Sequence, residues 1–173
     1  GYRGLIQNDY KEMKPQDFSG ILTLGGTILG TSRQPFKEIE NPVNTDDPKS
    51  PTRLDAMVKT YEKLKLDGLI ILGGNGTHKS AYSLHKRGLK VITLPKTIDN
   101  DLWGTEMTFG FQSAVNIATH VIDSIHTTAT SHGRVFIIEL MGHKAGWLTL
   151  HAGIAGGADI ILIPEIPYSI DAL

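Results

Sequence analysis

The sequence has 173 residues, of which 40% are hydrophobic and 20% charged, and its formal net charge is −1. These values are typical of one soluble globular domain with a substantial core. A net charge this close to zero argues against broad attraction to nucleic acid or anionic lipid. No apolar run approaches the roughly 20 residues that span a bilayer, so we expect neither nucleic acid nor a membrane as a partner.

The sequence contains no cysteine, and no signal peptide is visible. Disulfides and thiolate chemistry are therefore excluded, which is compatible with the cytoplasm, where we expect the protein. Residue 1 is Gly rather than Met, and the chain stops just past a strand-like run. We therefore expect residues 1–173 to be a single α/β domain taken from a longer protein.

The first half of the chain predicts two helices, a strand and a third helix. Asp17 is a candidate cap for a short helix, and Thr52 with Asp55 resembles a capping box that opens a longer amphipathic helix. The apolar run 69–72 predicts a buried strand. A further helix is expected to begin near His78 and to end at residue 87.

The second half continues this alternation. Strands are predicted at 89–94, 133–140 and 160–163, and helices at about 109–130 and 145–156. Short apolar strands separated by helices indicate an α/β fold. We expect a doubly wound, mostly parallel sheet with helices on both faces.

Three polar loops follow predicted strands, at residues 73–77, 95–101 and 141–144. In sheets of this kind ligands bind outside the carboxyl ends of the strands. We therefore expect the three loops to converge on one site.

The loop 95–101 carries the densest chemistry. It contains Lys96, Thr97, Asp99 and Asp101. A cation and a hydroxyl suit an anion, and two carboxylates suit a general base and a Mg²⁺ ligand, which together are the inventory of phosphoryl transfer. The alternative is that Asp and Asn here only cap a turn.

Two glycine-rich segments are weaker signals. Residues 25–33 end in Arg33, and residues 73–77 join a strand to a helix, so either segment could present backbone N–H groups to a phosphate. Residue types alone favour a solvated turn for 25–33. Of the seven histidines only His143 lies on a candidate loop, and Glu165, after the last predicted strand, is more typical of an end cap.

Taken together, these motifs resemble those of the 6-phosphofructokinase family. The matching segments follow one another in the family's order and cover nearly the whole chain, at residues 1–5, 25–33, 73–77, 95–101, 141–147 and 155–159. The resemblance implies transfer of a phosphoryl group to the 1-hydroxyl of fructose 6-phosphate. It also implies a homo-oligomer in the full-length protein, and a chain of residues 1–173 that is inactive by itself.

The resemblance assigns roles on the sugar side. Asp99 would be the general base on the sugar hydroxyl, and Thr97 would contact the moving phosphoryl group. Asp101 would help to hold Mg²⁺. The sugar phosphate would be bound by Met141, Gly142 and His143.

On the donor side the resemblance implicates Arg33, Gly74, Asn75, Gly76, Thr77 and Lys96. A small residue at Gly76 is the pattern of ATP-using members, whereas Lys96 is shared with enzymes that use pyrophosphate. We favour ATP as the donor, with pyrophosphate as the alternative.

Two residues depart from the family's pattern. The family usually has Asp where Asn75 stands, which removes one metal-associated charge, and many members have Arg where His143 stands. These departures motivate a second hypothesis, a weakened regulatory subunit that binds phosphometabolites, although the intact Asp99 argues against it. A Rossmann dehydrogenase is excluded, because no Gly-x-Gly-x-x-Gly opens a helix.

Overall fold

The structure is a computed structural model, and it describes residues 1–47 and 49–173. Contacts between residues divide the chain into two compact units, each described by itself below. The first unit comprises Gly1–Ile71 and Asn75–Thr93, and the second comprises Leu72–Gly74 and Leu94–Leu173. The single domain expected from the sequence stays a prediction.

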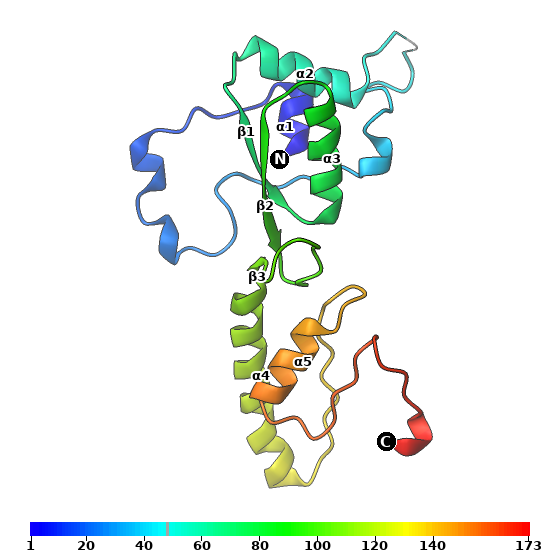
Figure 1. The fold of residues 1–173 in the computed structure, drawn as a ribbon. Coiled ribbons are helices and arrows are strands. Elements are labelled where there is room, and N and C mark those ends of the chain that lie inside the picture. The colour runs from blue at the N-terminus through cyan, green and yellow to red at the C-terminus, as the bar shows by residue number, and fades with distance from the viewer. Residues whose placement is uncertain (48) are drawn as a thin grey trace. The chain divides into compact units, whose positions relative to one another are not determined.

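Three helices and the amino-terminal parts of two strands build the first unit (Figure 1). The helices are α1 (Tyr2–Gln7), α2 (Arg53–Lys63) and α3 (Asn75–Lys86), and the strands are β1 (Leu69–Gly73) and β2 (Val91–Thr97). Their apolar faces meet in one core, made of Tyr2, Ile39, Leu54, Met57, Leu84 and Leu89.

Half of the capping box predicted for α2 is observed: Thr52 caps the helix, but the Asp55 carboxylate bonds to the Thr52 hydroxyl and not to the Thr52 backbone N–H. The backbone N–H of Asp55 donates to Thr52 Oγ1 over 3.0 Å, and Thr52 Oγ1 donates to Asp55 Oδ2 over 2.7 Å. Asp55 also accepts a hydrogen bond from Arg87, at the end of α3. These contacts fasten the start of α2 to the end of α3.

The helix α3 begins at Asn75, three residues before the predicted start at His78. Gly76 therefore lies in the first turn, where its low helix propensity costs little because few helical hydrogen bonds depend on it. The buried Ser80 hydroxyl donates to the Gly76 carbonyl over 3.3 Å, which helps to hold this turn.

The short helix predicted to begin at Asp17 is wrong in detail. Two 3₁₀ turns form instead, at Pro15–Phe18 and Ile21–Thr23. Asp17 lies inside the first turn, where it accepts hydrogen bonds from the Lys14 backbone N–H and from Lys11. Further 3₁₀ turns lie at Phe36–Glu38 and Ile170–Ala172.

The second unit contains β3 (Phe109–Gly110), α4 (Phe111–His132) and α5 (Trp147–Ala155). Strand order in the sheet is β1-β2-β3, and β3 pairs in parallel with β2, with Lys96 opposite Phe109 and Thr97 opposite Gly110. The strand predicted at 89–94 therefore starts two residues later and runs three residues further, because β3 supplies a partner for its end.

The helices α4 and α5 pack side by side (Figure 1). Their contact consists of small and aliphatic residues around Phe111, with Val115 and Leu148 in one cluster and Ala118, Ile122 and Ala152 in the next. Both helices confirm the prediction. α4 has 22 residues, yet no helix in the described part of the chain is long and apolar enough to cross a membrane.

Two predicted strands are not strands in the structure. Among the described residues, segments 133–140 and 160–163 join no ladder of the sheet. Val135 and Ile137 are 94% and 95% exposed, whereas Ile138 and Leu140 pack against the core cluster of Ala118, Ile122 and Ala152. This apolar run is therefore only partly covered. Both strand predictions are wrong, because a strand also needs the backbone groups of a neighbouring strand, which an apolar pattern alone does not provide.

Candidate functional site

The loop after β2 is shorter than the sequence suggested. β2 continues through Pro95, Lys96 and Thr97, so these residues belong to the strand rather than to a loop at 95–101. The reason is that Lys96 and Thr97 pair in parallel with β3. The polar groups that follow therefore stand at the carboxyl end of a strand, where ligands of α/β sheets bind.

Thr108 and Asn100 hold this loop in shape. Thr108, 3% exposed, donates from Oγ1 to the Thr97 carbonyl over 2.8 Å. Its backbone N–H donates to Asn100 Oδ1 over 2.9 Å. Asn100 has a φ of 52°, in the left-handed region that asparagine tolerates better than most residues. The conformation of the loop is thus held by hydrogen bonds of Asn100 and Thr108.

The carboxylates of Asp99 and Asp101 take no part in the hydrogen bonds that hold the loop. The Asp99 backbone N–H donates to Thr97 Oγ1 over 3.2 Å, which closes a small turn. Within the described residues, neither aspartate side chain makes a hydrogen bond or an ion pair. Of the Asp and Asn residues that the alternative interpretation assigned to capping the turn, Asn100 has that role, together with Thr97. Both carboxylates are left without such a role.

Two further groups lie close to Thr97. Lys96, opposite Phe109 in the ladder, is exposed and forms no ion pair in the part of the chain that the structure describes. A Cβ added to Gly74 would lie 4.0 Å from Thr97 Cβ, so the end of β1 borders the end of β2. Within the second unit Gly74 therefore lies beside Thr97, whereas Asn75, Gly76 and Thr77 belong to the first unit. The convergence of the three loops stays a prediction.

The turn at 141–144 has a separate geometry. The Ala145 N–H donates to the Gly142 carbonyl over 2.9 Å, and His143 has a φ of 53°. A Cβ on Gly142 would overlap the Ala145 carbonyl oxygen, so only glycine fits there. Met141 and His143 are exposed on this turn. Among the hydrogen bonds of the described residues, none connects the turn to the loop containing Asp99.

Glu165 caps α5. Its Oε1 accepts a hydrogen bond from the backbone N–H of Gly146, the residue that precedes the helix, over 2.7 Å. A carboxylate at a helix N-terminus is also favoured by the helix dipole. Glu165 is therefore a cap, but at the start of α5 and not at the end of the strand predicted at 160–163, which does not form.

The predicted donor residues lie largely in the first unit. Asn75, Gly76 and Thr77 form the first turn of α3, where backbone N–H groups have no acceptor within the helix. A Cβ added to Gly76 would meet no atom within 4 Å, so open space borders this turn. Arg33 is exposed on the preceding long loop, and its guanidinium forms no ion pair within the described residues.

The metal-ligand prediction names Asp101 and Asn75. No group of three or more His, Cys, Asp or Glu side chains stands together among the described residues. Mg²⁺ does not need such a group, because it commonly takes one or two protein carboxylates and completes its shell with water and substrate phosphates. A carboxylate and an amide oxygen therefore fit Mg²⁺ chemically.

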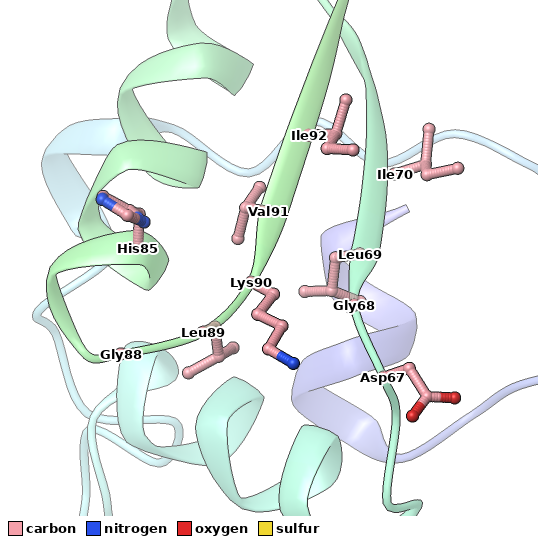
Figure 2. Close-up of a pocket in the computed structure, with 10 residues that line it drawn as sticks. All are labelled: Asp67, Gly68, Leu69, Ile70, His85, Gly88, Leu89, Lys90, Val91 and Ile92. Atoms are coloured by element: carbon pink, nitrogen blue, oxygen red, sulfur yellow. The ribbon is translucent and has the colours of Figure 1, made fainter.

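A hollow of about 660 Å³ opens at the other end of the strands (Figure 2). Its rim includes the polar side chains of Asp67, His85 and Lys90, and its wall is formed by the beginnings of β1 and β2. None of the predicted site residues lines it. It lies away from the carboxyl ends of the strands, so we do not include it in the candidate site.

Sequence reasoning missed the residues that support the site. Thr108 carries no motif of its own, and the family-like segment 1–5 gave no sign of the bond that Tyr2 makes. The hydrogen bonds of Thr108 and Tyr2 reach residues 11 and 75 positions away. For Asn100 the sequence does indicate a structural role, because asparagine in a polar loop adopts a positive φ more readily than most residues.

Comparison with known proteins identifies the family. The family model described as phosphofructokinase matches residues 1–173. The chain belongs to the phosphofructokinase family. The α/β class with a parallel sheet and helices, predicted from the sequence, is confirmed with it.

Two curated relatives of this family carry the same description. The chain is 62% identical over 171 residues to the ATP-dependent 6-phosphofructokinase of Spirochaeta thermophila, covering 98% of this chain and 46% of the relative. It is 52% identical over 173 residues to that of Propionibacterium freudenreichii subsp. shermanii, covering 100% of this chain and 45% of the relative. The chain thus spans about half the length of these phosphofructokinases.

A solved phosphofructokinase has a similar fold. The structure of the Pichia pastoris enzyme in the T-state matches with a TM-score of 0.78 at 26% identity, over 99% of this chain and 18% of that one.

Proposed function

We propose that this chain carries the phosphoryl-transfer residues of an ATP-dependent 6-phosphofructokinase, which makes fructose 1,6-bisphosphate from fructose 6-phosphate. The main support is the braced loop at the end of β2, which leaves the half-buried Asp99 carboxylate without a partner among the described residues beside the Thr97 hydroxyl. The names of the curated relatives support the same reaction.

Asp99 serves as the general base. It accepts the proton of the sugar 1-hydroxyl as that oxygen forms a bond to the γ-phosphorus of ATP. The bond from the γ-phosphorus to the bridging oxygen of ADP breaks, and ADP leaves. Thr97, fixed through its carbonyl by Thr108, presents its side chain to the transferred group. In such reactions positioning and charge management supply most of the catalysis.

The first turn of α3 serves the phosphoryl donor. The backbone N–H groups of Asn75, Gly76 and Thr77, which have no acceptor within the helix, and the positive end of the helix dipole favour an anion. Arg33 and Lys96 add cations. The open space beside Gly76 supports a bulky donor such as ATP. Lys96 is the reason to keep pyrophosphate as the alternative donor.

Mg²⁺ supplies neutralisation of phosphate charge when it is bound. Asp101 would hold it directly or through water, and Asn75 would accept a hydrogen bond from a metal-bound water. Met141, Gly142 and His143 bind the sugar phosphate. By the resemblance, the full-length protein is a cytoplasmic homo-oligomer.

The test is phosphorylation of fructose 6-phosphate by the full-length protein with Mg²⁺ and either ATP or pyrophosphate. Turnover with ATP alone is the expected result. Turnover with pyrophosphate alone would make Lys96 the better guide to the donor. Binding of fructose 6-phosphate without turnover on either donor would overturn the proposal in favour of a regulatory subunit weakened by Asn75 and His143.

A further inference from the structure

Tyr2 of α1 reaches the first turn of α3. Its hydroxyl donates a hydrogen bond to the Thr77 carbonyl over 2.8 Å, across 75 residues of chain. The Tyr2 ring is 8% exposed and belongs to the same core cluster as Leu84 of α3. Burial raises the pKa of the Tyr2 phenol, so the hydroxyl keeps its proton and remains a donor throughout the physiological range.

The same end of α1 also contacts the segment that carries Arg33. The backbone N–H of Arg3 donates to Ser32 Oγ over 3.2 Å. A Cβ added to Gly1 would lie 2.7 Å from the Ser32 backbone nitrogen, so the two backbones approach closely. Ser32 immediately precedes Arg33. One short helix therefore touches both donor-side segments of the first unit.

The hydrogen bond from Tyr2 is not needed to form α3. A carbonyl oxygen has two lone pairs, and in an α-helix one of them accepts the N–H four residues ahead. The Tyr2 hydroxyl adds a bond from outside the helix. Its effect is to fix where the first turn of α3 lies on α1, and therefore where the N–H groups of Asn75, Gly76 and Thr77 lie.

We propose that Tyr2 is a positioning residue of the phosphoryl-donor site, which holds the first turn of α3 in its donor-binding place. This rests on the proposed function, in which that turn binds the donor. If the first turn shifts among several placements, donor affinity falls by the fraction of time spent in the right one. The net worth of one neutral hydrogen bond limits this loss to roughly 3- to 10-fold.

The test compares Tyr2→Phe with Tyr61→Phe in the full-length protein. Both substitutions remove one hydroxyl beside the same core cluster, but the Tyr61 hydroxyl makes no hydrogen bond within the described residues. The KM for ATP and the KM for fructose 6-phosphate are measured separately. Binding of ATP is also titrated directly, which requires no turnover.

Tyr2→Phe is expected to raise the KM and the dissociation constant for ATP by roughly 3- to 10-fold, with the KM for fructose 6-phosphate unchanged. Tyr61→Phe is expected to change neither. If Tyr2→Phe only reduced the fraction of folded protein, the maximal rate would fall and the KM for ATP would not rise selectively. Ser32→Ala is the second variant, because it removes the acceptor of the Arg3 N–H without touching the core, and it should also weaken ATP binding selectively.

Unchanged ATP affinity in Tyr2→Phe would overturn the positioning role while leaving the proposed function intact. Equal changes in the KM of both substrates would overturn it as well. A Tyr2→Phe protein that does not fold would overturn it too, because the bond would then be needed for the fold and not only for the placement of the first turn. A wild-type protein that neither binds ATP nor phosphorylates fructose 6-phosphate contradicts the proposed function first, and the positioning role with it.

Discussion

The buried hydroxyl of Thr108 donates a hydrogen bond to the carbonyl oxygen of Thr97, 2.8 Å away. This bond joins the residue before β3 to the last residue of β2, just before Asp99 and Asp101, whose side chains have no partner among the described residues. The position of Asp99, the candidate base, therefore depends on Thr108, which has no proposed contact with substrate.

Thr108→Val is expected to destabilise the protein by about 1–3 kcal/mol, because it leaves the Thr97 carbonyl without its side-chain partner. Urea denaturation measures the change in the free energy of unfolding. The matched control is Thr119→Val on α4, because Thr119 Oγ1 is buried and has no partner among the described residues. Thr119→Val should change stability by less than about 0.5 kcal/mol or increase it. Equal losses in both variants would contradict the bracing role of Thr108.

Gly76→Asp is expected to raise the KM for ATP at least ten-fold and to affect pyrophosphate use less. The added carboxylate would occupy the open space beside the first turn of α3 and repel the nucleotide's phosphates. Steady-state kinetics with each donor measures the difference. Gly76→Ala is the control for size, since its methyl group enters open space and should leave both donors nearly unaffected. Equal impairment of both donors by Gly76→Asp would remove Gly76 as a guide to donor choice.

His143→Arg is expected to lower the KM for fructose 6-phosphate by roughly 3- to 10-fold. Arginine is always charged and offers a planar fork of donors to a phosphate, which His143 does not. Lys144→Arg, one residue further along the same turn, keeps its charge and should have little effect. No gain from His143→Arg would indicate that the exposed turn at 141–144 does not contact the sugar phosphate.

Asp55 is expected to make stability depend on acidity. The Thr52 hydroxyl, and after it Arg87, lower the pKa of the Asp55 carboxyl below its ordinary value. A lowered pKa means that the stabilisation is present above the unfolded value, near about pH 4, and is lost as the pH falls through the folded pKa. The pair is partly exposed, so Asp55→Asn should cost about 1 kcal/mol or less at neutral pH.

Urea denaturation followed from neutral to strongly acidic pH measures this dependence. The two curves, wild type and Asp55→Asn, should converge at the acidic end. Asp123→Asn on α4, where the aspartate is exposed, is the control and should run parallel to wild type throughout. A constant difference between wild type and Asp55→Asn would show that charge on Asp55 is not what stabilises the protein.

Local signals in the sequence predicted the helices well. Thr52 and Asp55 lie three residues apart, and the hydrogen bonds that start α2 need nothing else. The apolar stripe of α4 is equally local. The candidate site residues could also be predicted from the sequence, because Thr97, Asp99 and Asp101 lie at or just after the end of an apolar run that predicts a strand.

Contacts between residues far apart in the sequence could not be predicted from it. Segments 133–140 and 160–163 have the apolar pattern of strands, but pairing depends on neighbours elsewhere in the chain. The same reason hid the bonds from Tyr2 to Thr77 and from Thr108 to Thr97. Neither tyrosine nor threonine has a spacing rule that points across such separations.

The role of Asp99 as the general base is tested most directly by the turnover of Asp99→Asn in the full-length protein. Asparagine keeps the size of the side chain but cannot accept the proton of the sugar hydroxyl. We expect kcat with ATP to fall by roughly 10²- to 10⁴-fold, while the protein still binds fructose 6-phosphate with near-normal affinity. Turnover close to that of the wild type would contradict the assignment of Asp99 as the general base.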